Sequence, residues 1–361
     1  MSKARELAEL GAVYDSGALS NRNIIINGEM KLAQRGTSFS TSTSTIYTLD
    51  RFQSATGSSF NFDLTLTQST DSPTGFSNSL KITPDSTQTP SGSDNGAIRY
   101  NIEAQDLQSL GYGSSDAKKM TLSFYVKSNK TGTYSLQLIG YDGQGTCLVG
   151  YTIDASNTWE RKTITIDPDT SNAFANDNTL GILIAWQIAG GADDVRTPTS
   201  SWALSDTGFR IVSGQVNFMD STSNEWYLTG VQLEVGSEAT PFEHRSFGDE
   251  LLRCQRYYFH TYEPGTAIGT ATANGAIAHS LDGTQTYARA MCFYPVEMRA
   301  RPTAVAYNVN DGTANQVNGD STNATAAYAF QGHRSINVGV SNVSFSTSVF
   351  LRYQLTADAE L

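Results

Sequence analysis

The sequence predicts an all-β protein in which a large jelly-roll-like β-sandwich is followed by a smaller C-terminal β-sandwich. Short segments of alternating apolar and polar residues recur at spacings of about 8 to 12 residues or somewhat more, with almost no helical pattern between them. Charged residues make up only 16% of the chain, whereas Ser, Thr, Asn and the 31 glycines are abundant, as expected for short strands joined by polar turns. The length of 361 residues suits two or three domains. No repeat of fixed period is present, so a propeller or a long β-helix is not supported.

The first predicted element is a short N-terminal helix within residues 1–22. Ser2 precedes a helical pattern over residues 3–10, and Gly11 is placed to end it. A helix this short is marginal alone in water, so it should form by packing against a partner. The alternative is a frayed tail. The apolar side chains available for a partner are Ala4, Leu7, Ala8 and Leu10.

The large sandwich is predicted over residues 23–245. Leu122, Phe124 and Val126 alternate cleanly with polar neighbours, the period of two expected for a strand with one buried face. Comparable patterns predict strands at 23–28, 47–52, 60–67, 79–83, 97–102, 120–128, 133–141, 147–153, 159–166, 180–188, 208–218 and 225–235.

A helical linker is predicted over residues 246–262. The last strand of the large sandwich stops before Pro241, and Asp249 is placed to cap a new helix. Leu251, Cys254 and Tyr258 then lie at i, i+3 and i+7, on one stripe of that helix.

The C-terminal sandwich is predicted over residues 263–361. Its strands are expected at 287–294, 303–309, 324–331, 335–340 and 344–355, and Phe350 is the single exception to the alternation of the last one. Two long segments rich in Gly, Asn, Asp and Thr, at 263–284 and 310–323, are expected to be polar loops.

Three stretches carry a resemblance to a known family. They are Asn23-Ile-Ile-Ile-Asn-Gly28, Tyr47-Thr-Leu-Asp-Arg-Phe52 and the run from Glu225 to Tyr258, which ends in Cys254-Gln-Arg-Tyr-Tyr258. They resemble tail-fibre and receptor-binding proteins of tailed bacteriophages, particularly marine and cyanophage-like ones. The resemblance is strongest in residues 1–52 and 224–262.

The resemblance implies a virion structural protein without enzymatic activity, made in the host bacterial cytoplasm and mounted on the phage as a tail fibre. It implies a homotrimer that attaches to tail or baseplate proteins through Ala4, Leu7, Ala8 and Leu10. The fibre would recognise a glycan or protein on the host cell surface. Two alternatives stay open: a capsid or tail decoration protein with a role in assembly, and a carbohydrate-binding module.

Two further groups of residues are expected to act in that role. Trimer contacts are assigned to Leu251, Tyr257, Tyr258 and Tyr262, which could pack around a threefold axis or instead belong to the core of one chain. Receptor recognition is assigned to the two polar loops, because long loops on a rigid scaffold commonly carry function; they could also be solvated turns. The candidate receptor residues are Thr266, Asn274, Asp282, Asp311, Asn315, Asn318 and Asp320.

Catalysis is not expected. The nearest carboxylate clusters are Asp193 with Asp194, Glu103 with Asp106, and Asp167 with Asp169, each in a turn-rich stretch where Asp normally bonds the local backbone. The four histidines are scattered, and the three cysteines form no C-x-x-C pair, so no zinc site, disulfide frame or cofactor is predicted. Calcium at Asp311, Asn315 and Asp320 would depart from the EF-hand pattern, and a plain polar loop fits better.

Aromatic and charged residues limit the remaining possibilities. Trp186 and Trp226 adjoin apolar strands and should be core, whereas Trp202 follows a polar loop and could be exposed or packed; Trp159 is a further candidate for sugar stacking. The net charge of −11 and the lack of a Lys/Arg block disfavour nucleic acid as a partner. No apolar run approaches the ~20 residues of a membrane span, and a signal peptide is not evident, so no membrane insertion is expected.

Overall fold

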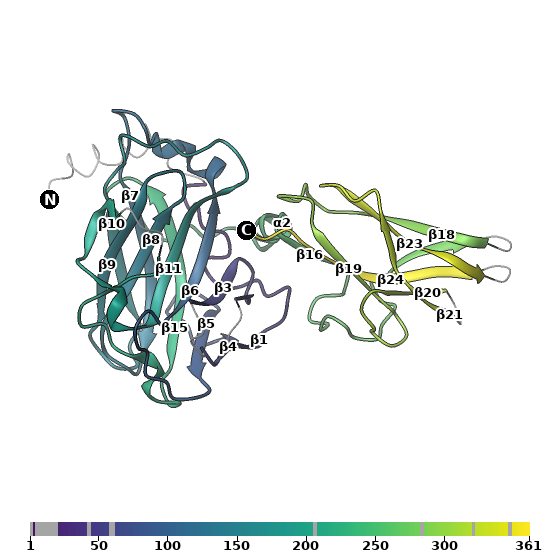
Figure 1. Cartoon of the computed structure of the whole chain (residues 1–361), viewed down its shortest axis with the longest axis horizontal. Helices are drawn as coiled ribbons and strands as arrows, with labels where there is room; N and C mark the ends of the chain where they lie inside the picture. Colours follow the sequence, from purple (N-terminus) through teal and green to yellow (C-terminus); the bar gives the residue numbers. More distant parts are fainter. Residues whose placement is uncertain are drawn as a thin grey trace.

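The computed structural model describes Lys3 and residues 21–41, 45–57, 62–204, 208–281, 285–319, 322–345 and 349–361 (Figure 1). These residues form an all-β fold with several sheets, as predicted from the sequence. Their helices are short: α2 (Phe247–Gln255) and the 3₁₀ turns η1 (Ala104–Leu110), η2 (Ala192–Asp194) and η3 (Phe218–Asp220). Within the described part of the chain, no helix has the length and apolarity of a membrane span. The predicted N-terminal helix, with Ala4, Leu7, Ala8 and Leu10, lies outside the described residues.

Two antiparallel sheets face each other in the large sandwich. In spatial order, the first contains β1 (Ser38–Thr41), β4 (Leu64–Ser69), β5 (Ser79–Pro84), β15 (Trp226–Val235), β7 (Met120–Ser128) and β10 (Glu160–Ile166). The second contains β13 (Thr199–Leu204), β9 (Gly145–Ile153), β8 (Gly132–Gly140), β11 (Leu180–Gly190), β6 (Asn95–Glu103), β3 (Phe52–Gly57) and β2 (Ile46–Tyr47). A short parallel pair, β12 (Val195–Arg196) with β14 (Ile211–Val212), lies beside them. Because β15 inserts between β5 and β7, and β11 between β6 and β8, strands distant in sequence pair as in a jelly roll.

The core between these sheets follows the predicted alternation. Leu122, Phe124 and Val126 are fully buried, and so are Trp186 and Trp226, which confirms the two tryptophans as core residues. The three cysteines are buried and free, which confirms that they form no disulfide. The residues of this core lie between Ile25 and Leu233.

Three segments of the large sandwich differ from the prediction. Residues 23–28 form no strand, because Asn27 adopts the left-handed conformation (φ 59°) and the Asn23 side chain accepts hydrogen bonds from the Ile25 and Leu233 amides. Residues 47–52 turn between β2 and β3, with Arg51 at φ 72°. Within 208–218, only the two residues of β14 are paired as a strand among those described.

Helix α2 lies between the two sandwiches in Figure 1. Its N-cap is Ser246, whose hydroxyl accepts a hydrogen bond from the Asp249 amide, so the helix begins earlier than predicted. Cys254 is buried and Leu251 packs partly buried beside it. The helix ends at Gln255, so Tyr258 belongs to the strand that follows it.

The C-terminal sandwich is organised around β24 (Val349–Asp358). This strand pairs with β16 (Tyr258–His260) and β17 (Ile277–Leu281), and also with β19 (Thr303–Tyr307) and β20 (Gln316–Gly319), beyond which lies β21 (Thr322–Thr325). The facing sheet is β18 (Gln285–Phe293), β23 (Ser335–Phe345) and β22 (Ala327–Ala329). Leu351, Tyr353 and Leu355 are fully buried, whereas Phe350 is 47% exposed, so the alternation predicted for this strand is correct. The predicted strand at 344–355 divides between β23 and β24.

Candidate functional site

The two segments predicted as receptor loops come together on the C-terminal sandwich. Their loop portions, residues 263–276 and 308–315, are called the paired loops below. Gly312 has φ 76°, and a Cβ atom built on it would lie 1.8 Å from the carbonyl oxygen of Gly269. Only glycine allows two backbones to approach so closely in this conformation. Segments about 40 residues apart in sequence therefore form one surface.

The first paired loop is held by buried polar side chains of the scaffold. Gln354 of β24 is fully buried and donates to the carbonyl oxygens of Thr272 (3.2 Å) and Asn274 (2.7 Å). The Thr261 hydroxyl donates to the Gln354 side-chain oxygen at 2.6 Å. The Tyr262 hydroxyl accepts from the Gly269 amide at 3.1 Å. These bonds satisfy the loop backbone and fix its position on the sheet.

The second paired loop is held by its own Asp311 and by side chains of β21 and β22. Asp311 accepts from the Thr313 amide (2.9 Å) and from the Asn323 side chain (3.0 Å), and the Thr313 backbone bond lowers the pKa of the Asp311 carboxyl. Asn315, at φ 58°, accepts from the Tyr328 hydroxyl at 3.0 Å. The Asx bond of Asp311 and the two bonds from the strands give the loop a defined conformation, while Asp311 and Asn315 stay exposed.

The candidate receptor residues divide into three groups. Asn274, Asp311 and Asn315 are exposed on the paired loops, and Thr266 is partly exposed. Asn318 lies in β20 and is fully buried, which corrects its assignment: the predicted loop at 310–323 contains a hairpin of β20 and β21, and 263–284 likewise contains β17. Asp282 and Asp320 lie outside the described residues.

The sequence prediction missed an exposed apolar face on the same sandwich. Met291 and Phe293 of β18 are 49% and 70% exposed, and Phe330, just after β22, is 77% exposed. Their alternation with the buried Ala290 and Cys292 is the sequence signal that places Met291 and Phe293 outward. Exposed apolar side chains gathered on one face are typical of interaction surfaces.

The motifs that carry the family resemblance meet between the two sandwiches, in what is called the interdomain joint. Arg51 is 1% exposed, pairs with Glu360, and stacks its guanidinium 3.4 Å from the ring centre of Tyr257. Burial alone would lower the pKa of Arg51, but the Glu360 carboxylate raises it. The guanidinium therefore stays charged although it is buried.

Further contacts of the joint connect Glu103 of β6 to the residues that follow α2, and Arg35 to β16 and β24. Glu103 accepts from Arg256 at 2.9 and 2.8 Å and from the Tyr257 hydroxyl. Arg35 pairs with Asp358 at 2.9 Å and lies 3.7 Å from the ring centre of Tyr258. The joint is thus built from one buried ion pair, two partly exposed ion pairs and stacked rings, a combination that favours a defined geometry.

The joint changes the assignment of the trimer contacts. Tyr257, Tyr258 and Tyr262 are 1%, 6% and 3% exposed within a single chain, where they pack in the joint or support the paired loops. The alternative that they belong to the core of one chain accounts for these contacts, and they leave little ring surface for a symmetry axis. Leu251 is partly buried against the same cluster.

The carboxylate clusters considered for catalysis make structural contacts. Glu103 belongs to the joint, Asp194 pairs with Arg210 at 3.0 Å, and Asp167 accepts from the Ser200 and Ser201 hydroxyls. Asp169 accepts from the amides of Ser171 and Asn172. Among the residues that the structure describes, no group of three His, Cys, Asp or Glu side chains is arranged to hold a metal ion.

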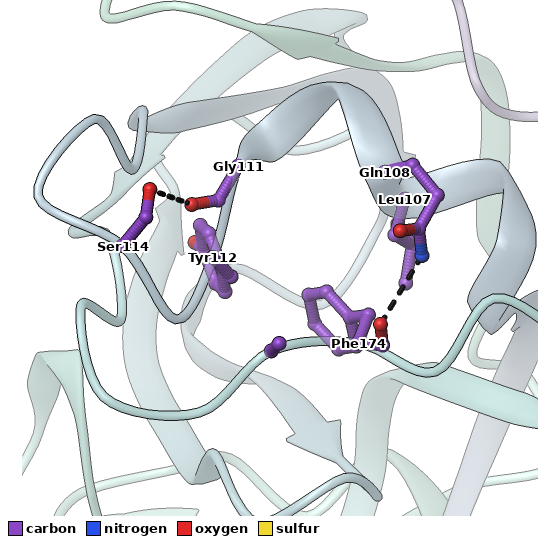
Figure 2. Close-up of a pocket in the computed structure, with 7 residues that line it drawn as sticks. Leu107, Gln108, Gly111, Tyr112, Ser114 and Phe174 are labelled. Atoms are coloured by element: carbon purple, nitrogen blue, oxygen red, sulfur yellow. Dashed lines mark hydrogen bonds between the residues drawn. The ribbon is translucent and has the colours of Figure 1, made fainter.

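A small hollow lies at one end of the large sandwich, between η1 and residues 173–174 (Figure 2). Its volume is about 210 Å³, and the stacked rings of Tyr112 and Phe174 form its wall. The Trp202 indole donates to the Tyr112 hydroxyl, so this tryptophan has a packing role. Gln108 and Ser114 bond to backbone carbonyls within the rim. The hollow is smaller than the ~300 Å³ of typical ligand pockets, and it is not the candidate site.

Comparisons with known proteins give no family or sequence relative and only distant structural likenesses. No protein-family model matches the sequence, and no curated protein matches it. Among solved structures, the enzymatically active domain of the Bacteriophage CBA120 tailspike protein 4 aligns at 14% identity over 59% of this chain, with a TM-score of 0.29; the chain spans only 21% of that domain.

Two carbohydrate-binding modules from Clostridium thermocellum show a similar degree of likeness. The family 22 module aligns at 9% identity over 61% of this chain and 99% of its own, with a TM-score of 0.29. The family 11 module aligns at 11% identity over 56% and 98%, with a TM-score of 0.27. These values mark distant likenesses.

Proposed function

We propose that this chain is a receptor-binding tail fibre of a tailed bacteriophage and that the paired loops recognise a glycan or protein on the host surface. The observation that carries the proposal is the meeting of two polar loops on one rigid sandwich. Asn274 and Asn315 present amide groups that can donate to and accept from sugar hydroxyls. The exposed apolar face of β18 supports the same sandwich as the binding part.

The other parts of the chain have supporting roles in this proposal. The large sandwich is a spacer, and the joint keeps the C-terminal sandwich in a fixed orientation toward the cell. Residues 1–22 attach the fibre to the virion, so deletion of residues 1–20 would abolish incorporation into particles and leave folding intact. Three copies per fibre would convert weak single contacts into avid binding. The chain acts as a binder and performs no catalysis.

Cells of a susceptible host, labelled with the fluorescent full-length protein, provide the test. Replacing Asn274 and Asn315 together by alanine should reduce labelling at least tenfold, because each loses hydrogen bonds to the receptor. The control is Thr222→Ala, at an exposed position of the large sandwich. If the double variant labels cells as well as the wild type, the paired loops do not bind the receptor. Labelling by a protein that contains only residues 23–245 would move the site to the large sandwich.

A further inference from the structure

Arg99 lies on the face of the second sheet of the large sandwich that points away from the core. Arg99 of β6 pairs across the sheet with Ala185 of β11 and with Gln53 of β3, between strands that adjoin in Figure 1. Its neighbours Ile98 and Tyr100 point into the core, so Arg99 points away from it. The side chain is partly buried.

The guanidinium of Arg99 stacks on an aromatic ring. It lies 3.8 Å from the ring centre of Phe209, and its Nε atom is buried without an acceptor. Among the described residues no carboxylate pairs with it, although the chain carries 35 acidic residues and pairs Arg35, Arg51 and Arg256 with carboxylates. Burial lowers the pKa of Arg99 to about 10, so the side chain stays positively charged at neutral pH. A partly desolvated cation without a partner is costly unless a ligand provides the anion.

The surface around Arg99 is suited to a sugar ring. Ala97, Ile139, Leu183 and Ala185 form a small buried apolar cluster under this outer face, and the partly buried Phe209 packs against it. Tyr141, at the end of β8, is 45% exposed and close enough to Arg99 that each influences the pKa of the other. An exposed tyrosine offers an aromatic face for the C–H side of a pyranose and a hydroxyl for its polar edge.

We propose that Arg99, Tyr141 and Phe209 form a binding site for a short acidic saccharide, whose carboxylate or sulfate group pairs with the guanidinium of Arg99. Arginine presents a planar pair of N–H donors that matches either group. The ligand should be short and carry few charges, because a protein with a net charge of −11 repels a dense polyanion. This site is separate from the paired loops and does not depend on their proposed function.

Calorimetric titration of the full-length protein tests the site with three tetrasaccharides of equal length: one neutral, one with a single glucuronate and one with a single sulfate. We expect at least one acidic sugar to bind at least tenfold more tightly than the neutral one. The better of the two identifies the anion. Equal affinity for all three sugars would overturn the proposal.

Variants distinguish a ligand-binding role of Arg99 from a purely structural role. Arg99→Gln should remove the preference for the acidic sugar, whereas Arg99→Lys should keep part of it, because lysine retains the charge without the planar fork. Tyr141→Ala should weaken the binding of all three sugars. Arg301→Gln, at an exposed arginine of the C-terminal sandwich, makes the same change in net charge and should have no effect.

Two results would decide against the site. An acidic preference that persists in Arg99→Gln, with an unchanged melting temperature, refutes it. Loss of the preference in the Asn274 and Asn315 double variant would place the acidic sugar on the paired loops instead. Failure of cell labelling by the loop variant has no bearing on Arg99, so the two proposals fail independently.

Discussion

Single side chains in the interdomain joint serve both sandwiches at once. Glu103 ends β6 of the large sandwich, yet its carboxylate accepts hydrogen bonds from Arg256 and Tyr257, which follow α2. Arg51 turns the chain between two strands and pairs with Glu360 beyond the last strand. Both partners are buried, and without Arg51 the Glu360 carboxylate keeps only its pair with Arg35 at 3.3 Å.

Arg51→Gln should therefore destabilise the protein by about 3 kcal/mol, because Glu360 loses its main cationic partner inside the joint. Differential scanning calorimetry measures the change in the unfolding of both sandwiches. Arg334→Gln is the matched control, because its ion pair with Glu297 is exposed and should contribute less than about 1 kcal/mol. Equal effects of the two changes would contradict a structural role of the buried pair.

His260 of β16 should make stability depend on pH. The pKa of His260 is lowered. Burial lowers it most, Asp50 and a backbone hydrogen bond at Tyr262 raise it in part, and Arg35 lowers it further. The unfolded chain therefore binds a proton at higher pH than the folded chain. The stabilisation is present above the unfolded pKa, near 6.5, and is lost as the pH falls through the lower folded value.

We expect the melting temperature to fall between pH 7 and pH 5, and His260→Gln to remove part of that fall. His333→Gln, at an exposed histidine, is the control and should behave as the wild type. If the melting temperature of the His260 variant depends on pH as strongly as that of the wild type, this side chain does not contribute to the pH dependence of stability.

At the scale of elements, the paired loops depend on the contact of Gly312 with Gly269. Gly312→Ala should destabilise the C-terminal sandwich by about 2 kcal/mol or more and weaken cell labelling, since the added methyl meets a carbonyl oxygen. Gly265→Ala is the control: Gly265 has a similar φ of 81°, but no atom lies within 4 Å of the added Cβ. Similar losses in the two variants would mean that only the backbone conformation matters.

Strands with one buried face were predictable from the sequence, and segments fixed by polar side chains were not. The alternation in β7 and β24 follows from burial of Leu122 or Leu351 and is visible in the sequence alone. Residues 23–28 are as apolar as a strand, but Asn23 and Asn27 bond the backbone and bend it. Nothing in a local pattern reveals that Asn23 will meet Leu233.

For the candidate site, too, the local features could be predicted from the sequence and the tertiary contacts could not. Glycine and asparagine in residues 263–276 and 308–315 indicate loops, but the contact between them is tertiary. Asn318 has the composition of a loop residue and is buried because β20 pairs with β24. Arg99 could not be singled out, because a sequence pattern does not show that none of the described carboxylates reaches its guanidinium.

At the scale of the whole molecule, the prediction of a homotrimer remains to be tested. Since the tyrosines after α2 are buried, the apolar side chains of α2 that remain available are Phe247 (59% exposed) and Leu252 (46%). Light scattering at micromolar concentration should give the mass of three chains, and Leu252→Asp should dissociate them if α2 lies at the axis. Leu252→Met keeps the side chain apolar and should remain trimeric. A wild-type protein that stays monomeric at high concentration would contradict the prediction.

The interdomain joint also sets an order of events during synthesis. All strands of the two main sheets of the large sandwich lie before residue 236, so they can pair while the ribosome is still making the rest. Arg35 and Arg51, however, find Asp358 and Glu360 only some 300 residues later. Until those residues emerge, both arginines must remain hydrated. The two sandwiches can thus fold as separate units, and the ion pairs that connect them form only in the last step.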